Sequence, residues 1–354
     1  MTDLEKLCSR VTEAADCAVI TDDVNRRYFT AMKSSAGTLV VFPGKAYFII
    51  DFRYIEKAKK TVTACEVILQ DKLYEQINSL IEKHGAKTVS VNADTCTLSE
   101  LIAYQQKLNA EVIADTKLAE IIREIRTVKS QEQIDKIIKA QRIAEKGFAH
   151  MLDFIKVGRT EKEIQLELDY YMLKNGAEAL SFDTIALSGS NTSLPHGVPS
   201  DKKVESGEFV LMDFGATYDG WHSDMTRTVC VGKPSDKMKS VYETVLTAQL
   251  SALDAVKAGM SGKALDKIAR DIITEAGYGD NFGHSLGHGV GVEIHESPYA
   301  SPSREDILPK NSIVTVEPGI YLEGKFGVRI EDFVVVTENG CINMTKAPKE
   351  LICL

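Results

Sequence analysis

Two aspartates in one short segment are spaced so that their carboxylates can act together. Asp213 and Asp224 lie in the segment VLMDFGATYDGWHSDMTRT, residues 210–228, where apolar and β-branched residues flank Asp219-Gly220. This pattern is typical of a β-hairpin, and an Asp-Gly pair favours a two-residue type I′ turn. Such a turn places Asp224 opposite Gly215, with Asp213 one diagonal step away on the same face. Neighbouring carboxylates repel each other unless a cation or a shared proton intervenes. The hairpin therefore indicates a cation site, and two exposed acids on an edge hairpin are the alternative.

A second pair of acids follows at nearly the same distance along the chain. Glu317 lies 104 residues after Asp213, and Glu331 lies 107 residues after Asp224. The two glutamates belong to another predicted hairpin, formed by residues 313–321 and 327–337. If the pairing is centred on Gly324, the two glutamates lie directly opposite each other.

The helix signals repeat with the same period. Capping residues predict helix starts at Ser130 and Thr160, and again at Ser235 and Ser261, which are 105 and 101 residues further on. The C-terminal part is thus predicted to contain two copies of a helix–helix–hairpin unit. Two hairpins that face each other would bring four acids to one centre. Unrelated α+β elements are the alternative.

Histidines concentrate in the same part of the chain. Five of the seven lie between residues 196 and 295, and His284 and His288 have glycine neighbours, which let the backbone approach another group closely. Four carboxylates with an imidazole suit Mn²⁺, Co²⁺, Fe²⁺ or Zn²⁺ better than a structural zinc site, which prefers thiolates. Four acids exceed what one divalent ion needs, so two ions about 3.5–4 Å apart are expected.

The sequence pattern of the first third of the chain predicts a smaller α/β domain. Short apolar runs alternate with amphipathic segments up to about residue 122, and residues 123–129 form a charged passage that we interpret as a linker before a domain of residues 130–354. Ser99 is the predicted cap of one helix. The segment 22–28 is interpreted as a solvated turn, with a ligand-facing loop as the alternative. The predicted strands are 17–21, 38–42, 47–51, 66–69, 89–91 and 111–114, and the predicted helices are 2–14, 53–60, 74–84 and 99–108.

Composition narrows the class of protein. A charged fraction of 26% and a hydrophobic fraction of 44% are ordinary for a globular protein, and the net charge of -9 argues against nucleic acid or an anionic membrane as partner. The seven cysteines are scattered and odd in number, which fits reduced thiols. No segment is typical of a signal peptide or a membrane span. We expect a cytoplasmic protein.

Several motifs resemble a known family. The hairpin MDFGATYDGWHSDMTRT, the passage GHSLGHGVGVEIHESP, and the segments VEPGIY and VRIEDF are similar to the signature set of the pita-bread metallopeptidases. The leading domain and SFDTIALSGSNTSLPHG resemble the Xaa-Pro aminopeptidase and prolidase branch, over essentially the whole chain. The resemblance implies an α+β fold, in which a creatinase-type α/β domain precedes a pita-bread catalytic domain. It also implies a homodimer.

The resemblance also implies roles for individual residues. Two divalent ions, with Mn²⁺ the first choice, would be bound by Asp213, Asp224, His288, Glu317 and Glu331. A water held between the ions would attack the peptide bond before proline, and Glu317 would accept its proton. His196, His284 and His295 would line the site and stabilise the reacting carbonyl, and Arg329 would orient a bridging carboxylate.

More than one function is compatible with these residues. The expected activity is Xaa-Pro aminopeptidase, and a dipeptidase (prolidase) restricted to Xaa-Pro dipeptides is the first alternative. A methionine aminopeptidase shares the ligand set, but the leading domain of about 120 residues argues against it. A metal-free hydrolase acting on a small guanidino compound, and a non-catalytic peptide-binding module on the same fold, are more distant alternatives. The complete ligand set argues against both.

Overall fold

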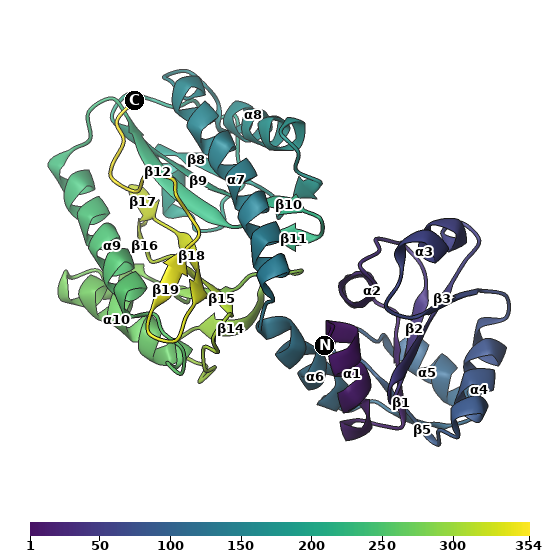
Figure 1. Cartoon of the computed structure of the whole chain (residues 1–354). Helices are drawn as coiled ribbons and strands as arrows, with labels where there is room; N and C mark the ends of the chain where they lie inside the picture. Colours follow the sequence, from purple (N-terminus) through teal and green to yellow (C-terminus); the bar gives the residue numbers. More distant parts are fainter. The chain divides into compact units, whose positions relative to one another are not determined.

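The computed structural model describes all residues, 1–354, and the chain divides into two compact units, Met1–Arg126 and Thr127–Leu354 (Figure 1). The predicted boundaries of 1–122, 123–129 and 130–354 stay a prediction. Helix α6 (Lys117–Thr127) runs through most of the charged passage that was interpreted as a linker.

The first unit contains one six-stranded mixed sheet with helices on both faces. The strand order is β4-β3-β2-β1-β5-β6, in which β2 is antiparallel to both of its neighbours and the remaining pairs are parallel. Ala18 and Ile20 pack with α1, α2, α3 and α6, whereas Cys17 and Val19 face α4 and α5. This alternation follows from the two-residue period of a strand. The strands are β1 (Cys17–Ile20), β2 (Thr38–Phe42), β3 (Lys45–Ile50), β4 (Glu66–Leu69), β5 (Thr88–Val91) and β6 (Glu111–Ile113). The other helices are α1 (Asp3–Arg10), α2 (Asp23–Thr30), α3 (Ile55–Thr61), α4 (Leu73–His84) and α5 (Leu98–Lys107).

Two local predictions for this unit are wrong. The segment interpreted as a solvated turn is mostly helix α2, which Asp22 caps by accepting a hydrogen bond from the backbone of Asn25. Asn25 and Arg26 are buried, so tertiary contacts decide this helix. The cap of α5 is Thr97 instead of Ser99, because Thr97 and Glu100 form the capping box.

The second unit contains the predicted repeat of two helices followed by strands. Helices α7 (Gln131–Phe154) and α8 (Glu161–Lys174) open the first copy, and α9 (Asp236–Ala255) and α10 (Gly262–Glu275) open the second. Their N-caps are the four predicted residues, Ser130, Thr160, Ser235 and Ser261. The helix pairs lie on opposite sides of the strands (Figure 1). The strands of the first copy are β7 (Ala179–Leu180), β8 (Ile185–Ser188), β9 (Glu208–Phe214), β10 (Ala216–Tyr218), β11 (Trp221–His222) and β12 (Met225–Val231). Those of the second copy are β13 (Gly287–Gly289), β14 (Glu296–Ala300), β15 (Ile313–Val316), β16 (Gly319–Leu322), β17 (Phe326–Arg329), β18 (Asp332–Val336) and β19 (Cys341–Asn343).

The register of the first hairpin is the predicted one. Asp219 and Gly220 have φ values of 49° and 81°, as a type I′ turn requires. Thr217 pairs with His222 and Phe214 pairs with Met225, so the same register sets Gly215 opposite Asp224. A Cβ on Gly215 would lie 1.9 Å from the carbonyl oxygen of Ser223. Only glycine fits there.

The second hairpin also has the predicted register. Gly319 pairs with Arg329 and Val316 pairs with Asp332, which sets Glu317 opposite Glu331. Gly324, at the turn, has a φ of 66°. Each hairpin is therefore interrupted at its acids, where one strand pair gives way to the next.

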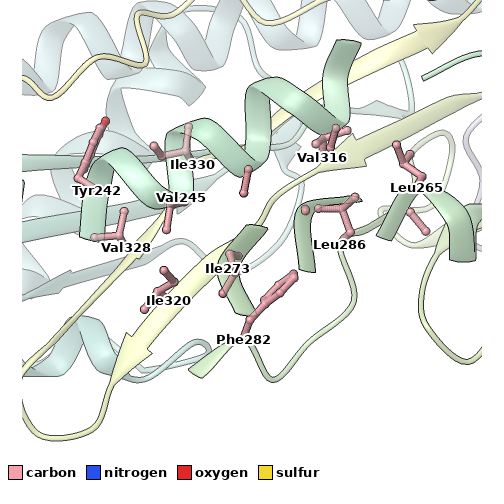
Figure 2. Close-up of a cluster of buried hydrophobic side chains, with 14 of the residues drawn as sticks. Tyr242, Val245, Leu265, Ile273, Phe282, Leu286, Val316, Ile320, Val328 and Ile330 are labelled. Carbon is pink, nitrogen blue, oxygen red and sulfur yellow. The ribbon is translucent and has the colours of Figure 1, made fainter. Parts of the chain in front are cut away.

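The core beneath the second hairpin fixes the direction of the acidic side chains. Val316, Ile320, Val328 and Ile330 pack with side chains of α9 and α10, among them Tyr242, Val245, Leu265 and Ile273 (Figure 2). Because neighbouring residues of a strand point to opposite faces, Arg329 and Glu331, on either side of Ile330, point away from this core. None of the helices combines the length and the apolar character needed to cross a membrane.

Candidate metal centre

One cavity of the second unit contains every site residue that the sequence predicts. It has a volume of about 480 Å³. Asp224, Glu317 and Glu331 come from the breaks in the two hairpins. Asp213 lies near the end of β9, and His288 comes from strand β13. The predicted site residues that line the cavity are Asp213, Asp224, His288, Glu317, Glu331, His196, His284, His295 and Arg329.

Three of the predicted ligands lie close enough to share one ion. Asp224, His288 and Glu331 are buried, and one ligand atom from each lies within 4.8 Å of the others. His288 Nε2 lies 3.6 Å from Asp224 Oδ2 and 3.3 Å from Glu317 Oε1. His288 Nδ1 donates to the carbonyl oxygen of Gly289 over 3.0 Å, which leaves Nε2 facing the acids. A hydrogen bond from the other ring nitrogen is what orients an imidazole that binds a metal ion.

The carboxylates fit a cation because their charge is only partly compensated by the protein. Burial raises the pKa of Asp213, of Asp224 and of Glu331, and the negative charges of neighbouring acids raise those of Asp224 and Glu331 further. Asp213 Oδ1 and Glu331 Oε1 are buried and have no hydrogen-bond partner. Buried oxygens without partners are costly. Hard oxygen donors with one imidazole are a ligand set for divalent ions, so the residues present fit such a group.

Glu317 and His288 shift each other's pKa at the same centre. Burial would raise the pKa of Glu317, but the hydrogen bond and charge of His288 outweigh burial and hold the pKa near 2. Burial would lower the pKa of His288, but Glu317 and Asp224 raise it to about 9. Thr315 Oγ1 donates to Glu317 Oε1 over 2.9 Å and accepts from the backbone of His288 over the same distance. One threonine thus fixes both residues.

Arg329 lies directly behind the acids. Its Nη2 donates to Asp213 Oδ2 over 2.5 Å, and its Nε donates to Thr226 Oγ1 over 3.1 Å. Thr226 Oγ1 in turn donates to Glu331 Oε2 over 2.7 Å. The arginine therefore holds one acid of each hairpin, directly or through one hydroxyl.

The three other histidines differ in what their rings contact. His284 uses both nitrogens: Nδ1 donates to the carbonyl oxygen of Ser285 over 2.8 Å, and Nε2 bonds the Tyr321 hydroxyl over 2.9 Å. The rings of His196 and His295 make no hydrogen bond within the protein, and the His295 ring packs 4.3 Å from that of His288. Burial lowers the pKa of His284 and of His295, so both rings are neutral at pH 7. His196 and His295 therefore offer ring nitrogens to a ligand, and His284 fixes Tyr321.

The glycines beside the histidines have unequal roles. A Cβ on Gly287 would lie 2.0 Å from the carbonyl oxygen of Thr315, and one on Gly289 would lie 2.4 Å from that of Ser297. The expected close approach of backbone therefore holds on both sides of His288. Gly283, beside His284, has no heavy atom within 4 Å of such a Cβ, and close approach does not explain it.

The sequence did not identify several residues that line the cavity or support those that do. Tyr321 accepts a hydrogen bond from Arg329 Nη1 over 2.7 Å, and burial raises its pKa to about 12. The hairpin register contained the signal for Tyr321, because it pairs with Gly327, two residues from Arg329, and such diagonal neighbours can touch. The apolar part of the lining had no comparable signal. It consists of Phe182, Ile185, Pro195, Ile294 and Tyr299.

Comparison with known families and proteins agrees with this geometry. Residues 135–338 match metallopeptidase family M24, and residues 4–128 match the creatinase/prolidase N-terminal domain. A Bacillus subtilis protein described as an uncharacterized peptidase is 45% identical and covers 96% of both chains. The Xaa-Pro dipeptidase of Pyrococcus furiosus is 39% identical over 99% of both.

Solved structures give the same result. The Xaa-Pro dipeptidase from Bacillus anthracis has a TM-score of 0.95 at 42% identity and covers 99% of both chains. The X-Pro aminopeptidase from Thermotoga maritima has a TM-score of 0.91 at 38% identity, over 96% of this chain and 98% of its own. The predicted pita-bread fold with a creatinase-type leading domain is thus confirmed, and the family implies divalent metal ions. The chain belongs to metallopeptidase family M24, with the N-terminal domain of its creatinase and prolidase members.

Proposed function

We propose that the protein is an Xaa-Pro aminopeptidase, which hydrolyses the bond between an N-terminal residue and a following proline. The observation that carries this proposal is the convergence of four acids, three of them buried, and His288 in the cavity that also contains His196 and His295. Relatives named Xaa-Pro dipeptidase and X-Pro aminopeptidase support the choice of proline bonds. They also favour a second candidate, a dipeptidase restricted to Xaa-Pro.

The cavity suits a short peptide with a proline ring. Its volume of about 480 Å³ lies within the usual range for small-ligand sites. Phe182, Ile185 and Ile294 supply apolar surface for the ring. The bond before proline is a tertiary amide without an N–H, so a site that recognises it needs no acceptor at that position.

The residues of the site divide the catalytic work. Asp213, Asp224, His288, Glu317 and Glu331 would hold two divalent ions, whose positive charge would polarise the substrate carbonyl and acidify water. The carboxylate of Glu317 would take the proton of the attacking water and pass it to the proline nitrogen. The free ring nitrogens of His196 and His295 would donate hydrogen bonds to the carbonyl oxygen as it gains charge. Tyr321, held by His284 and Arg329, would keep the arginine in place.

The finer assignments are part of the same proposal. Mn²⁺ is the proposed metal because the donors are mostly carboxylates, with Co²⁺, Zn²⁺ and Fe²⁺ as alternatives. The cytoplasm is the proposed location, since all seven cysteines are free thiols, as in reducing compartments. A homodimer is proposed from the family resemblance alone.

The test is hydrolysis of Ala-Pro and Ala-Pro-Ala by the metal-loaded protein, with Ala-Ala and Ala-Ala-Ala as controls. Cleavage of both proline peptides supports the aminopeptidase, and cleavage of Ala-Pro alone supports the dipeptidase. The Glu317→Gln variant should lose either activity because the amide cannot accept the proton. Failure to cleave either proline peptide would overturn the proposal.

A further inference from the structure

A buried carboxylate that does not line the cavity of the metal centre holds the loop that carries His196. Glu161 is the first residue of helix α8, and its side chain has no exposed surface. The His196 loop, residues 189–199, connects Ser188 at the end of β8 with Ser200. Helix α8 packs against β8, where this loop begins.

The Glu161 carboxylate binds the loop at both ends and near its start. Oε1 accepts from Ser188 N over 2.7 Å, from Ser188 Oγ over 3.2 Å and from Asn191 Nδ2 over 3.0 Å. Oε2 accepts from Ser200 N over 3.0 Å, from Ser200 Oγ over 2.6 Å and from Asn191 Nδ2 over 3.2 Å. The carboxylate therefore joins the two ends of the loop.

No cation lies within ion-pair distance of Glu161. The ammonium group of Lys202 donates to Ser188 Oγ over 3.1 Å, and it pairs with Glu208 over 2.7 Å instead of with Glu161. A buried carboxylate without a counter-ion is costly unless hydrogen bonds and dipoles compensate for lost hydration. Here the six hydrogen bonds and the N-terminus of a 14-residue helix supply that compensation. Because the Glu161 carboxylate is costly to bury and takes no part in the metal centre, we infer that it positions other residues.

Two further hydrogen bonds join the first half of the loop to strand β17 of the second hairpin. Thr192 Oγ1 accepts from the backbone of Gly327 over 2.8 Å, and the carbonyl oxygen of Pro195 accepts from Arg329 Nη1 over 3.3 Å. Between these points and Ser200 the loop has little packing, since Leu194 and Val198 are exposed and His196 itself is exposed. The hydrogen bonds of Glu161 with Ser188, Asn191 and Ser200, which we call the Glu161 clamp, therefore hold the part of the loop that follows His196.

We propose that Glu161 is a positioning residue that places His196 over the metal centre by clamping Ser188, Asn191 and Ser200 on one carboxylate. The proposal rests on the proposed function only for the catalytic role of His196. An amide cannot replace the carboxylate, because its NH₂ group would face a backbone N–H, of either Ser188 or Ser200. One end of the loop would then be released while the shape of the side chain is kept.

The test is a double-mutant cycle of Glu161→Gln and His196→Gln, in which kcat/KM is measured for each variant on Ala-Pro and Ala-Pro-Ala. We expect Glu161→Gln to lower kcat/KM about 10-fold or more. We expect it to have no further effect in a chain that already carries His196→Gln, because it acts through that ring. Two effects that simply multiply would show a general structural role and overturn the proposal. Glu163→Gln, an exposed change in the capping box of the same helix, is the matched control and should leave kcat/KM unchanged.

A second measurement does not depend on activity. Amide hydrogen exchange in residues 189–199 should be faster in Glu161→Gln than in the wild type, and unchanged in Glu163→Gln. Asn191→Ala removes two of the six hydrogen bonds to Glu161 from the loop side without altering α8, and should give a smaller local increase in exchange even if Glu161→Gln does not fold. Unchanged exchange in the loop of a folded variant would overturn the proposal. Wild-type protein that cleaves neither peptide would instead overturn the proposed function, and the exchange experiment would still decide whether Glu161 holds the loop.

Discussion

Arg329 Nη2 lies 2.5 Å from Asp213 Oδ2, and both side chains are buried beside the metal centre. The same guanidinium donates to Thr226, Tyr321 and the carbonyl oxygen of Pro195. One planar group therefore fixes an acid of the first hairpin, a tyrosine of the second and the loop that carries His196. A lysine can supply the charge at this place, but not the fork of donors.

The first prediction concerns this guanidinium. Arg329→Lys should lower kcat/KM about 10- to 100-fold and weaken metal binding, as is usual when a residue that orients a ligand is changed. Steady-state kinetics on Ala-Pro and calorimetric titration with Mn²⁺ would measure the two effects. Arg53→Lys, at an exposed arginine of the first unit, is the matched control. Kinetics and affinity equal to those of the control would show that Arg329 supplies charge alone.

The second prediction concerns removal of the metal. A chelator should abolish activity and lower the melting temperature of the second unit, because an ion that binds only the folded state stabilises it, by about 2.7 kcal/mol at 100 times Kd. Trp221 is the one tryptophan and is buried in this unit, so its fluorescence reports the transition. Mn²⁺ should restore both quantities in the wild type. In Glu331→Gln the melting temperature should respond weakly to the ion, and a full response there would argue against Glu331 as a ligand.

The sequence predicted much of this centre because turn chemistry fixes register. An Asp-Gly turn with both residues at positive φ settles which side chains share a face, so the positions of Asp213 and Asp224 followed from the spacing of a few residues. The four helix caps were equally local signals. The pairing of Glu317 with Glu331 followed from Gly324 in the same way.

Contacts between distant segments could not be predicted in this manner. Glu161 was expected to begin a helix, but its hydrogen bonds reach residues 27 to 39 positions further along the chain. Helix α2 was missed because buried Arg26, bonded to Ser34, stabilises a segment whose composition is typical of a turn. Periodicity and capping do not report such contacts.

The third prediction concerns a buried ion pair that links the two halves of the second unit. Arg227 on β12 donates from Nη2 to Asp332 Oδ1 on β18 over 2.7 Å, and neither side chain is more than 1% exposed. Arg227→Met should cost roughly 3–5 kcal/mol of unfolding free energy, because it leaves the Asp332 carboxylate without its main partner. Urea unfolding followed by Trp221 fluorescence would measure the loss.

A double variant, in which both members of the ion pair are replaced, is the control for this prediction. Combining Arg227→Met with Asp332→Asn should recover part of the loss, since no buried carboxylate is then left without its arginine and the Lys349 ammonium that remains is partly exposed. Burial would raise the pKa of Asp332, but Arg227 and Lys349 outweigh burial and lower it. The stability from this pair is therefore present above the ordinary aspartate pKa and is lost as the pH falls through the lowered value. A double variant less stable than Arg227→Met alone would contradict this account.

The fourth prediction concerns stability at alkaline pH in the first unit. Burial, followed by the charge of Asp16, raises the pKa of Cys17 from 9.0 to about 12. The unfolded thiol ionises from pH 9 upward while the folded thiol stays neutral, so the stabilisation is complete below pH 9 and is lost as the pH rises towards 12. The free energy of unfolding should fall by about 1.4 kcal/mol per pH unit for this thiol. Other thiols of this unit, Cys8 and Cys65, also have raised pKa values, so Cys17→Ala should reduce the overall slope by this amount in urea unfolding followed by far-UV circular dichroism. Cys353→Ala, at an exposed cysteine, should leave the slope unchanged. Equal slopes in the wild type and in Cys17→Ala would show that this thiol ionises alike in the folded and unfolded chains.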